Sequence, residues 1–203
     1  MDELPQSSAG KTIMTTEPKF IPNNAVAIKI GGRANVKVRL IDCVGFMVDG
    51  ATGHMEEEKE RMVKTPWFDY DIPFSKAAEI GTQKVISEHS TIGVVVTCDG
   101  SFTELSPEEY NKALDKTVKE LTSINKPFVI LVNSLDPKSP QCTKLRNEIA
   151  EKYQVSTIAV NCLKLNENDV NNIMKQAFPS IVDVNFTATM EGLLDCVAAG
   201  TVK

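Results

Sequence analysis

The stretch at residues 6–16, QSSAGKTIMTT, contains Gly10-Lys11-Thr12, the last three residues of the phosphate-binding pattern Gly-x-x-x-x-Gly-Lys-Ser/Thr. Such a P-loop needs a first glycine after a buried strand and a helix that begins behind the phosphates. Here Pro5 stands at the first glycine position, and Pro18 ends any helix that could follow. The sequence therefore favours a solvated loop around Lys11 over a phosphate cradle.

A second group with chemical potential is Asp42-Cys43-Val44-Gly45, which closes an expected strand at residues 36–41. An aspartate at that place can hold Mg²⁺, usually through water. The glycine lets a backbone N–H approach a terminal phosphate closely. The same pattern also occurs in simple turns, so on its own it leaves both interpretations open.

A third group, Asn133-Ser134-Leu135-Asp136, follows an expected strand at residues 127–132. It resembles the Asn-Lys-x-Asp signature of GTPases, in which the aspartate accepts hydrogen bonds from the base and the asparagine orders the loop. Ser134 replaces the lysine whose stem covers one face of the base, so we expect altered base recognition. An Asp-Pro turn is an equally open interpretation of this motif alone. The loop at Asn161, after the next strand, is expected to lie near the base.

These groups depend on the elements that carry them. Residues 25–30 and 36–41 alternate as two strands around a Gly31-Gly32 turn. Continuous apolar runs predict buried strands at 92–97, 127–132 and 156–160, and helical patterns cover 75–89, 106–124, 143–153 and 167–178. The stretch 42–73 is expected to be irregular. The order predicts an α/β domain with a mostly parallel sheet and one hairpin-linked antiparallel edge strand, with ligands at the carboxyl ends of the strands.

Composition narrows the classes of function. The chain has 203 residues, of which 42% are hydrophobic and 24% charged, as in a globular domain. Its net charge of −5 argues against non-specific nucleic-acid binding. The five cysteines include no Cys-x-x-Cys pair, which suits a reducing compartment, and no apolar run is long enough for a direct transmembrane segment.

The order of the groups is more informative than any one of them. Thr15 and Thr16 precede the hairpin and fall where P-loop GTPases keep a switch threonine that meets Mg²⁺ and the attacking water. The Asp42 and Asn133 motifs then follow in the order of that class. Gly10-Lys11-Thr12 is therefore interpreted as a decoy, and the true P-loop is expected before Met1.

Four segments carry a closer resemblance: DELPQSSAGKTIMTTEPKFIP, VRLIDCVGFMVDGATGH, RMVKTPWFDYDIPFSKAAEIGTQKVISEHSTIGVVVTCDGS and KPFVILVNS. They resemble the stage IV sporulation protein A family, over about residues 2–178. The resemblance implies a P-loop GTPase-like fold that uses ATP and Mg²⁺, and a spore-coat assembly protein whose ATP hydrolysis drives polymerisation around the forespore. It implies a cytoplasmic protein on the mother-cell side, a small membrane-bound anchoring protein and other spore-coat proteins as partners.

The resemblance also implies roles for single residues. Thr15, Thr16 and Asp42 would be catalytic, with Asp42 and Thr16 holding Mg²⁺ indirectly. The strand-end motifs, taken from the residues themselves, make Gly45, Asn133 and Asp136 the expected nucleotide contacts. His54 and Trp67 receive no role.

The chain departs from the family pattern, because the first strand, P-loop and first helix do not occur in it. We therefore expect residues 1–178 to be an incomplete nucleotide-hydrolase domain, inactive alone. Without the first strand, the edges of strands 36–41 and 92–97 would face a gap, so we expect the chain either to aggregate or to close these two edges on each other. Residues 179–203 would be a linker or the start of another domain. A regulatory GTPase and a non-catalytic structural subunit remain as alternatives, because Asp136 argues for guanine and only the resemblance argues for ATP.

Overall fold

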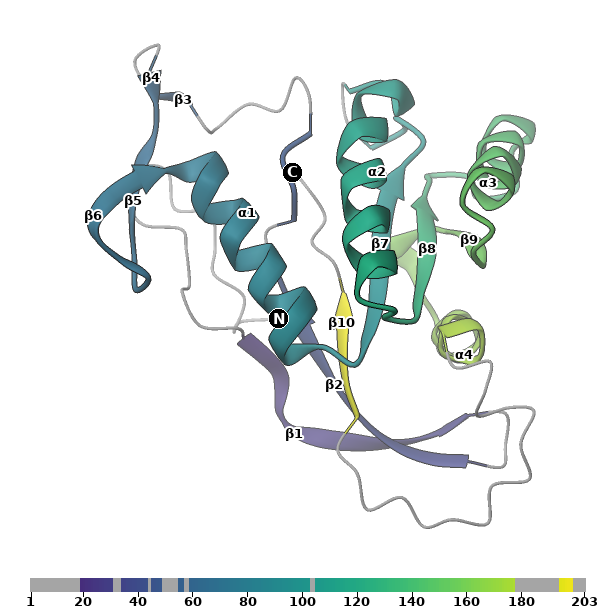
Figure 1. The fold of residues 1–203 in the computed structure, drawn as a ribbon. Coiled ribbons are helices and arrows are strands. Elements are labelled where there is room, and N and C mark those ends of the chain that lie inside the picture. Colours follow the sequence, from purple (N-terminus) through teal and green to yellow (C-terminus); the bar gives the residue numbers. More distant parts are fainter. Residues whose placement is uncertain are drawn as a thin grey trace.

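The computed structural model describes residues 19–30, 34–43, 45–48, 55–56, 59–102, 105–177 and 194–198. Its main sheet contains strands β1 (Lys19–Ile30), β2 (Ala34–Asp42), β7 (Ile92–Cys98), β8 (Phe128–Asn133), β9 (Thr157–Val160) and β10 (Leu194–Ala198). Helices α2 (Pro107–Ser123), α3 (Pro140–Tyr153) and α4 (Glu167–Ala177) alternate with the later strands. Figure 1 shows this arrangement.

The sheet is mostly parallel and has the order β1-β2-β10-β7-β8-β9. β1 pairs antiparallel with β2 and lies at the edge, whereas β2, β10, β7, β8 and β9 pair in parallel. The predicted α/β class, with one hairpin-linked antiparallel edge strand, is confirmed. The carboxyl ends of five strands therefore meet at one end of the sheet.

Two hydrophobic cores cover the two faces of the sheet. Val95 and Ile130 face a core built with α2 and α3, whereas Val94 and Val129 face a second core that includes Ile173 of α4. Because neighbouring residues of a strand point to opposite faces, strands covered on both faces must be apolar at every position. This explains the continuous apolar runs from which the strands were predicted.

The start of α2 follows the sequence signals closely. Ser106 is the N-cap, Pro107 takes the first helical position, and the Glu109 carboxylate accepts the Ser106 N–H at 2.6 Å. This capping box satisfies backbone donors that have no partner inside the helix. It fixes where the helix begins, at the position that the sequence predicted.

The space between β2 and β7 is filled by β10. Cys196 of β10 lies opposite Leu40 on one side and Ile92 on the other. The expectation that β2 and β7 could close directly on each other is therefore wrong, because the chain supplies a strand between them from its own later residues (Figure 1). The domain boundary expected after residue 178 falls among undescribed residues and stays a prediction.

Residues 55–73 were expected to be irregular, and this was wrong. They contain β3 (Met55–Glu56), β4 (Lys59–Glu60), β5 (Met62–Thr65) and β6 (Phe68–Pro73), which form two antiparallel pairs beside the main sheet. Val63 and Ile72 bury the β5–β6 pair against Ala77 of helix α1 (Phe74–Lys84). α1 continues into a π-helical turn, η1 (Val85–His89). Within the described chain, no helix combines the length and apolarity needed to cross a bilayer.

Candidate functional site

Asp42 ends β2 at the carboxyl end of the sheet. It lies level with Ala198 of β10, which in turn lies level with Val94 of β7. Surrounding protein raises the pKa of Asp42 by desolvation, and a hydrogen bond from the Cys43 backbone partly offsets this. The residue as a whole remains exposed to water. A cation at this place would lower that pKa again.

The loop after Asp42 is anchored by packing. Gly45 has a φ of 83°, which is in the left-handed region that favours glycine. The next side chain, Phe46, is only 4% exposed and joins the core under α2. Lys116 of α2 places its Nζ 4.7 Å from the centre of the Phe46 ring. Gly45 is therefore positioned by its conformation and by its neighbour.

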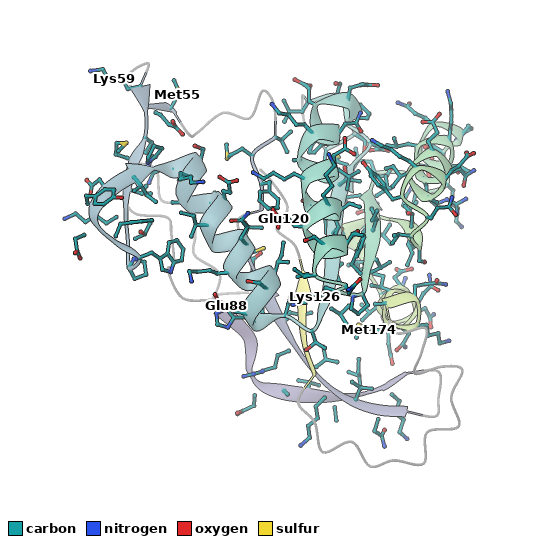
Figure 2. The ribbon with its side chains drawn as sticks, in the orientation of Figure 1. Met55, Lys59, Glu88, Glu120, Lys126 and Met174 are labelled. Carbon is teal, nitrogen blue, oxygen red and sulfur yellow. The ribbon has the colours of Figure 1, made fainter. Side chains whose placement is uncertain are left out.

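Lys116 also connects α2 to α1. Lys116 Nζ forms an ion pair with Glu79, which also binds Lys76 Nζ at 2.9 Å. The hydrogen bonds from Lys116 and Lys76 lower the pKa of Glu79. Gln83 of α1 donates to Glu120 of α2 at 3.1 Å, and Figure 2 shows Glu120 on the side of α2 toward α1. The loop after Asp42 is thus connected to the helix that carries the β5–β6 pair.

At β8, the structure brings the second motif to the same end of the sheet. Asn133 lies level with Cys98 of β7 and Val160 of β9. Its side chain is buried, and its Oδ1 accepts the Cys162 N–H at 2.9 Å. This contact orders the loop after β9, which is the role that the sequence suggested for the asparagine. Asp136 is exposed on the loop that follows.

Ser134 lies inside the protein, with 1% of its surface exposed. Its Oγ accepts the Asp136 N–H at 3.1 Å, and its side chain also bonds to Cys142 of α3. Burial raises the pKa of the Cys142 thiol above its ordinary value. A buried serine cannot cover the face of a base, so this position holds the loop in place instead.

Three loops are joined by side-chain hydrogen bonds. Ser101 Oγ donates to Asp99 Oδ1 at 2.5 Å and accepts the Leu135 N–H at 2.9 Å. Asn161 Nδ2 donates to the Leu135 carbonyl at 3.1 Å. The loops after β7, β8 and β9 therefore form one connected unit at the carboxyl end of the sheet.

The two motifs lie apart along that end. The strand order places β2 and β8 three spacings from each other, which is about 14 Å at the usual separation between strands. One carboxylate, Asp42, stands near one end of this span, and Asn133 with Asp136 stands near the other. The arrangement suits an elongated ligand with a metal-bound anionic end and a base at the opposite end.

The donor chemistry at Asp42 fits Mg²⁺. This ion keeps several waters and is usually bound through one or two carboxylates together with substrate phosphates. An all-protein cage would need more ligands, and the described residues contain no group of three or more His, Cys, Asp or Glu side chains placed to hold a metal. Asp42 therefore fits an indirect role in which most ligands come from water and nucleotide.

Thr15, Thr16 and His54 fall outside the described residues, as do Gly10, Lys11 and the whole segment 1–18. Trp67 is half-buried in the turn between β5 and β6. Three further residues, Asp99, Ser101 and Lys116, were not singled out from the sequence. Asp99 could have been found from its place directly after a buried strand, whereas Ser101 and Lys116 are revealed only by their tertiary contacts.

Comparison of the sequence with known proteins identifies the family of this chain. Residues 1–181 match the profile described as "Stage IV sporulation protein A, ATPase domain". Stage IV sporulation protein A from Bacillus anthracis is 48% identical over 187 residues, covering 91% of this chain and 38% of that protein. Its counterpart from Bacillus subtilis is 46% identical over 187 residues, with the same coverage.

A third relative, from Clostridioides difficile, is 45% identical over 196 residues, which cover 95% of this chain and 40% of that protein. The chain thus spans 38–40% of the length of these relatives. No solved structure matches it. The matched profile covers most of the chain, so the chain belongs to the family of the Stage IV sporulation protein A ATPase domain.

Proposed function

We propose that this chain supplies the metal-binding and base-binding parts of an ATPase that acts in spore-coat assembly. The observation that carries the proposal is that Asp42, Gly45, Asn133 and Asp136 all lie at the carboxyl end of one mostly parallel sheet. Ligands of open α/β sheets bind in this region. The family membership supports ATP as the nucleotide.

Each residue has a role that follows from its place. Bound Mg²⁺ would neutralise charge on the phosphates during their transfer to water. Asp42 would accept hydrogen bonds from waters of that ion, and the Gly45 N–H would contact the terminal phosphate. Asn133 orders the loop after β9 through the Cys162 N–H, and Asp136 would accept a hydrogen bond from the base. Thr15 and Thr16 are assigned to the metal and the attacking water.

We assign the phosphate cradle to a P-loop that is separate from these residues, so this chain alone is expected not to hydrolyse ATP. Backbone N–H groups and the P-loop lysine provide most of the phosphate binding in this class. Without that cradle, Asp42 has no anchored nucleotide on which to act. Two alternatives remain. A regulatory GTPase would bind GTP at the same end of the sheet, and a non-catalytic structural subunit would keep the fold without hydrolysing a nucleotide.

Self-polymerisation is the second part of the proposal, and the β5–β6 pair supports it. Phe68 and Tyr70 pack in a tilted arrangement with ring centres 5.3 Å apart, and Tyr70 keeps 64% of its surface exposed. Met62 on the neighbouring strand is 52% exposed. Figure 2 labels Met55 and Lys59 at the far end of this arm, away from the main sheet. Exposed aromatic clusters of this kind are typical of protein–protein contacts.

The location and partners follow from the family resemblance alone. We assign the protein to the cytoplasm on the mother-cell side of the forespore, with a small membrane-bound protein as anchor and other spore-coat proteins as neighbours. Co-purification from sporulating cells, with Tyr70→Ser as the assembly-deficient variant, would test these assignments. Recovery of the same partners without any assembly would separate anchoring from polymerisation.

The experiment for the nucleotide function is a competition between ATP and GTP in a longer protein that carries this region together with a P-loop. ATP should displace a bound fluorescent nucleotide at lower concentration than GTP does, and the purified chain of 203 residues should release no phosphate. A preference for GTP would favour the regulatory GTPase. Turnover by the chain alone, abolished by Lys11→Ala, would restore the Gly10-Lys11-Thr12 segment as a P-loop.

A further inference from the structure

The β5–β6 pair can supply only one of the two surfaces that a polymer of this protein needs. A contact that uses the same surface on both copies closes at a dimer, whereas a row of copies needs two different surfaces on each molecule. Met62, Phe68 and Tyr70 are exposed on the β5–β6 pair, and we call these three residues the arm surface. The second surface should also be exposed and apolar, and it should lie out of reach of the arm surface of the same copy.

A second group of exposed apolar side chains lies on the loops after β8 and β9. Leu163 keeps 80% of its surface exposed and belongs to the short 3₁₀ helix η2 (Cys162–Lys164), which follows β9. Leu135, on the loop after β8, keeps 56% of its surface exposed, and Leu165 keeps 39%. We call Leu135, Leu163 and Leu165 the leucine surface. Exposed apolar side chains grouped on neighbouring loops are typical of a contact with another protein.

Hydrogen bonds hold the loops of the leucine surface in place. Asn161 Nδ2 donates to the Leu135 carbonyl at 3.1 Å, which joins the two loops. The Leu163 N–H donates to Asn161 Oδ1 at 3.1 Å, and the Leu135 N–H donates to Ser101 Oγ at 2.9 Å. Loops that are ordered before binding lose little conformational entropy when a partner docks on them. The leucine surface is therefore suited to a specific contact.

The arm surface and the leucine surface lie on opposite sides of the molecule. The β5–β6 pair packs on Ala77 of α1, and η1, which continues α1, contacts Ile41 of β2 through Val85. β9 is the sheet edge farthest from β1 and β2, and Figure 1 shows β6 and β9 on opposite sides of the main sheet. The two surfaces therefore cannot meet within one copy. A contact between different copies leaves one free surface at each end, so further copies can add in a row.

The charges beside the two surfaces favour their pairing. Asp69 and Asp71 are exposed on β6, and Lys64 on β5 offsets only one of these charges. Lys164 is exposed between two members of the leucine surface, and Lys138 is exposed on the loop of the third. Acidic residues on these loops limit the attraction to the neighbourhood of the two lysines. Two arm surfaces in contact would bring carboxylates together, whereas an arm on the leucine surface brings carboxylates near lysines.

We propose that copies of this protein associate head to tail, with the arm surface of one copy packed on the leucine surface of the next. Tyr70 and Leu163 are the central residues of this contact, because each is the most exposed member of its surface. The inference rests on the proposed self-polymerisation. It adds the second surface and explains why association does not stop at a dimer.

The test is sedimentation velocity of the 203-residue chain, of Tyr70→Ser, of Leu163→Ser and of an equimolar mixture of the two variants. The wild-type chain should form oligomers whose size grows with concentration. Each variant lacks one surface, so it should need at least about tenfold higher concentrations to associate. In the mixture, the intact arm of Leu163→Ser meets the intact leucine surface of Tyr70→Ser. A one-to-one heterodimer should therefore form, without larger species.

Ile124→Ser is the matched control. Ile124 is exposed, but it lies just before β8, at the end of the sheet opposite to the leucine surface. This variant should associate as the wild type does. Circular dichroism should show the same fold for every variant, because each substituted side chain is exposed. If Tyr70→Ser or Leu163→Ser fails to fold, Met62→Ser and Leu135→Ser remove the same surfaces.

The outcomes separate this contact from the proposed polymerisation. Association of Leu163→Ser at wild-type concentrations would overturn the leucine surface and favour an arm-to-arm contact. A mixture that stays monomeric would overturn the pairing of the two surfaces. If the wild-type chain stays monomeric while a longer protein with this region and a P-loop assembles, the head-to-tail contact is wrong and self-polymerisation stands. If neither protein assembles, both proposals are wrong.

Discussion

Ser134→Ala tests whether the base loop is held from inside the protein. Ser134 is 1% exposed, its Oγ accepts the Asp136 N–H at 3.1 Å, and its side chain bonds to Cys142. Alanine has no hydroxyl group, so the Asp136 N–H and the Cys142 thiol would both lose this hydrogen-bond partner. A typical hydrogen bond contributes about 0.5–1.5 kcal/mol, and the thiol contributes the smaller share because it is a weak donor and acceptor. We therefore expect a loss of about 1–2 kcal/mol in the free energy of unfolding.

The assay is urea unfolding followed by circular dichroism, with thermal unfolding as a second measurement. The midpoint should fall without a change in slope, and Tm should drop by about 2–8 °C for a chain of this size. Ser123→Ala is the control, since Ser123 is exposed and bonds to the Glu120 carbonyl at 2.8 Å. It should cost less than about 0.5 kcal/mol. Equal losses for the two variants would refute the role given to Ser134.

Three further perturbations probe the elements that position the site. Gly93→Ala should lower the free energy of unfolding in urea by about 1–3 kcal/mol, because the new Cβ would lie 3.0 Å from Phe128 Cβ. An unchanged urea midpoint would contradict this close packing. Lys116→Met should cost about 0.5–1 kcal/mol at neutral pH. The pKa of Glu79 is lowered in the folded protein, so ionised Glu79 stabilises the fold at pH values above the ordinary carboxylate pKa. This contribution is lost as the pH falls through the pKa of Glu79 in the folded protein. The difference in stability between wild type and variant should therefore shrink in acid. A gap that stays constant with pH would assign the effect to Phe46 alone. Cys196→Pro should disrupt β10 and expose the edges of β2 and β7, so the variant should aggregate. Light scattering measures this aggregation. A variant that stays monomeric would show that β10 does not complete the sheet.

The parts of the fold that were predictable from sequence are those whose signal is local. β8 is a continuous apolar run because both of its faces are covered, and α2 carries its own cap at Ser106. β10 was not predicted, because Leu194–Ala198 is short and becomes a strand through the two strands that flank it. The β5–β6 pair was missed for a similar reason, since the burial of Val63 and Ile72 depends on Ala77 of α1, which is distant from Val63 in sequence.

The residues of the candidate site also divide into those with a local sequence signal and those whose role depends on distant contacts. Asp42, Asn133 and Asp136 could be singled out because Asp42 and Asn133 end their strands and Asp136 lies on the loop directly after β8. The roles of Ser134, Ser101 and Asn161 depend on partners in other loops. Such hydrogen bonds join residues that are distant in sequence, and no spacing rule reports them.

The most direct test of the account concerns Asp42. In a longer protein that carries this region with a P-loop, Asp42→Asn should lower the rate of phosphate release from ATP by at least about a hundredfold, with a much smaller effect on ATP binding. The reason is that the carboxylate positions the metal and its waters, whereas the P-loop holds the phosphates. Phosphate release at the wild-type rate by Asp42→Asn would contradict the central claim that this end of the sheet is the catalytic end.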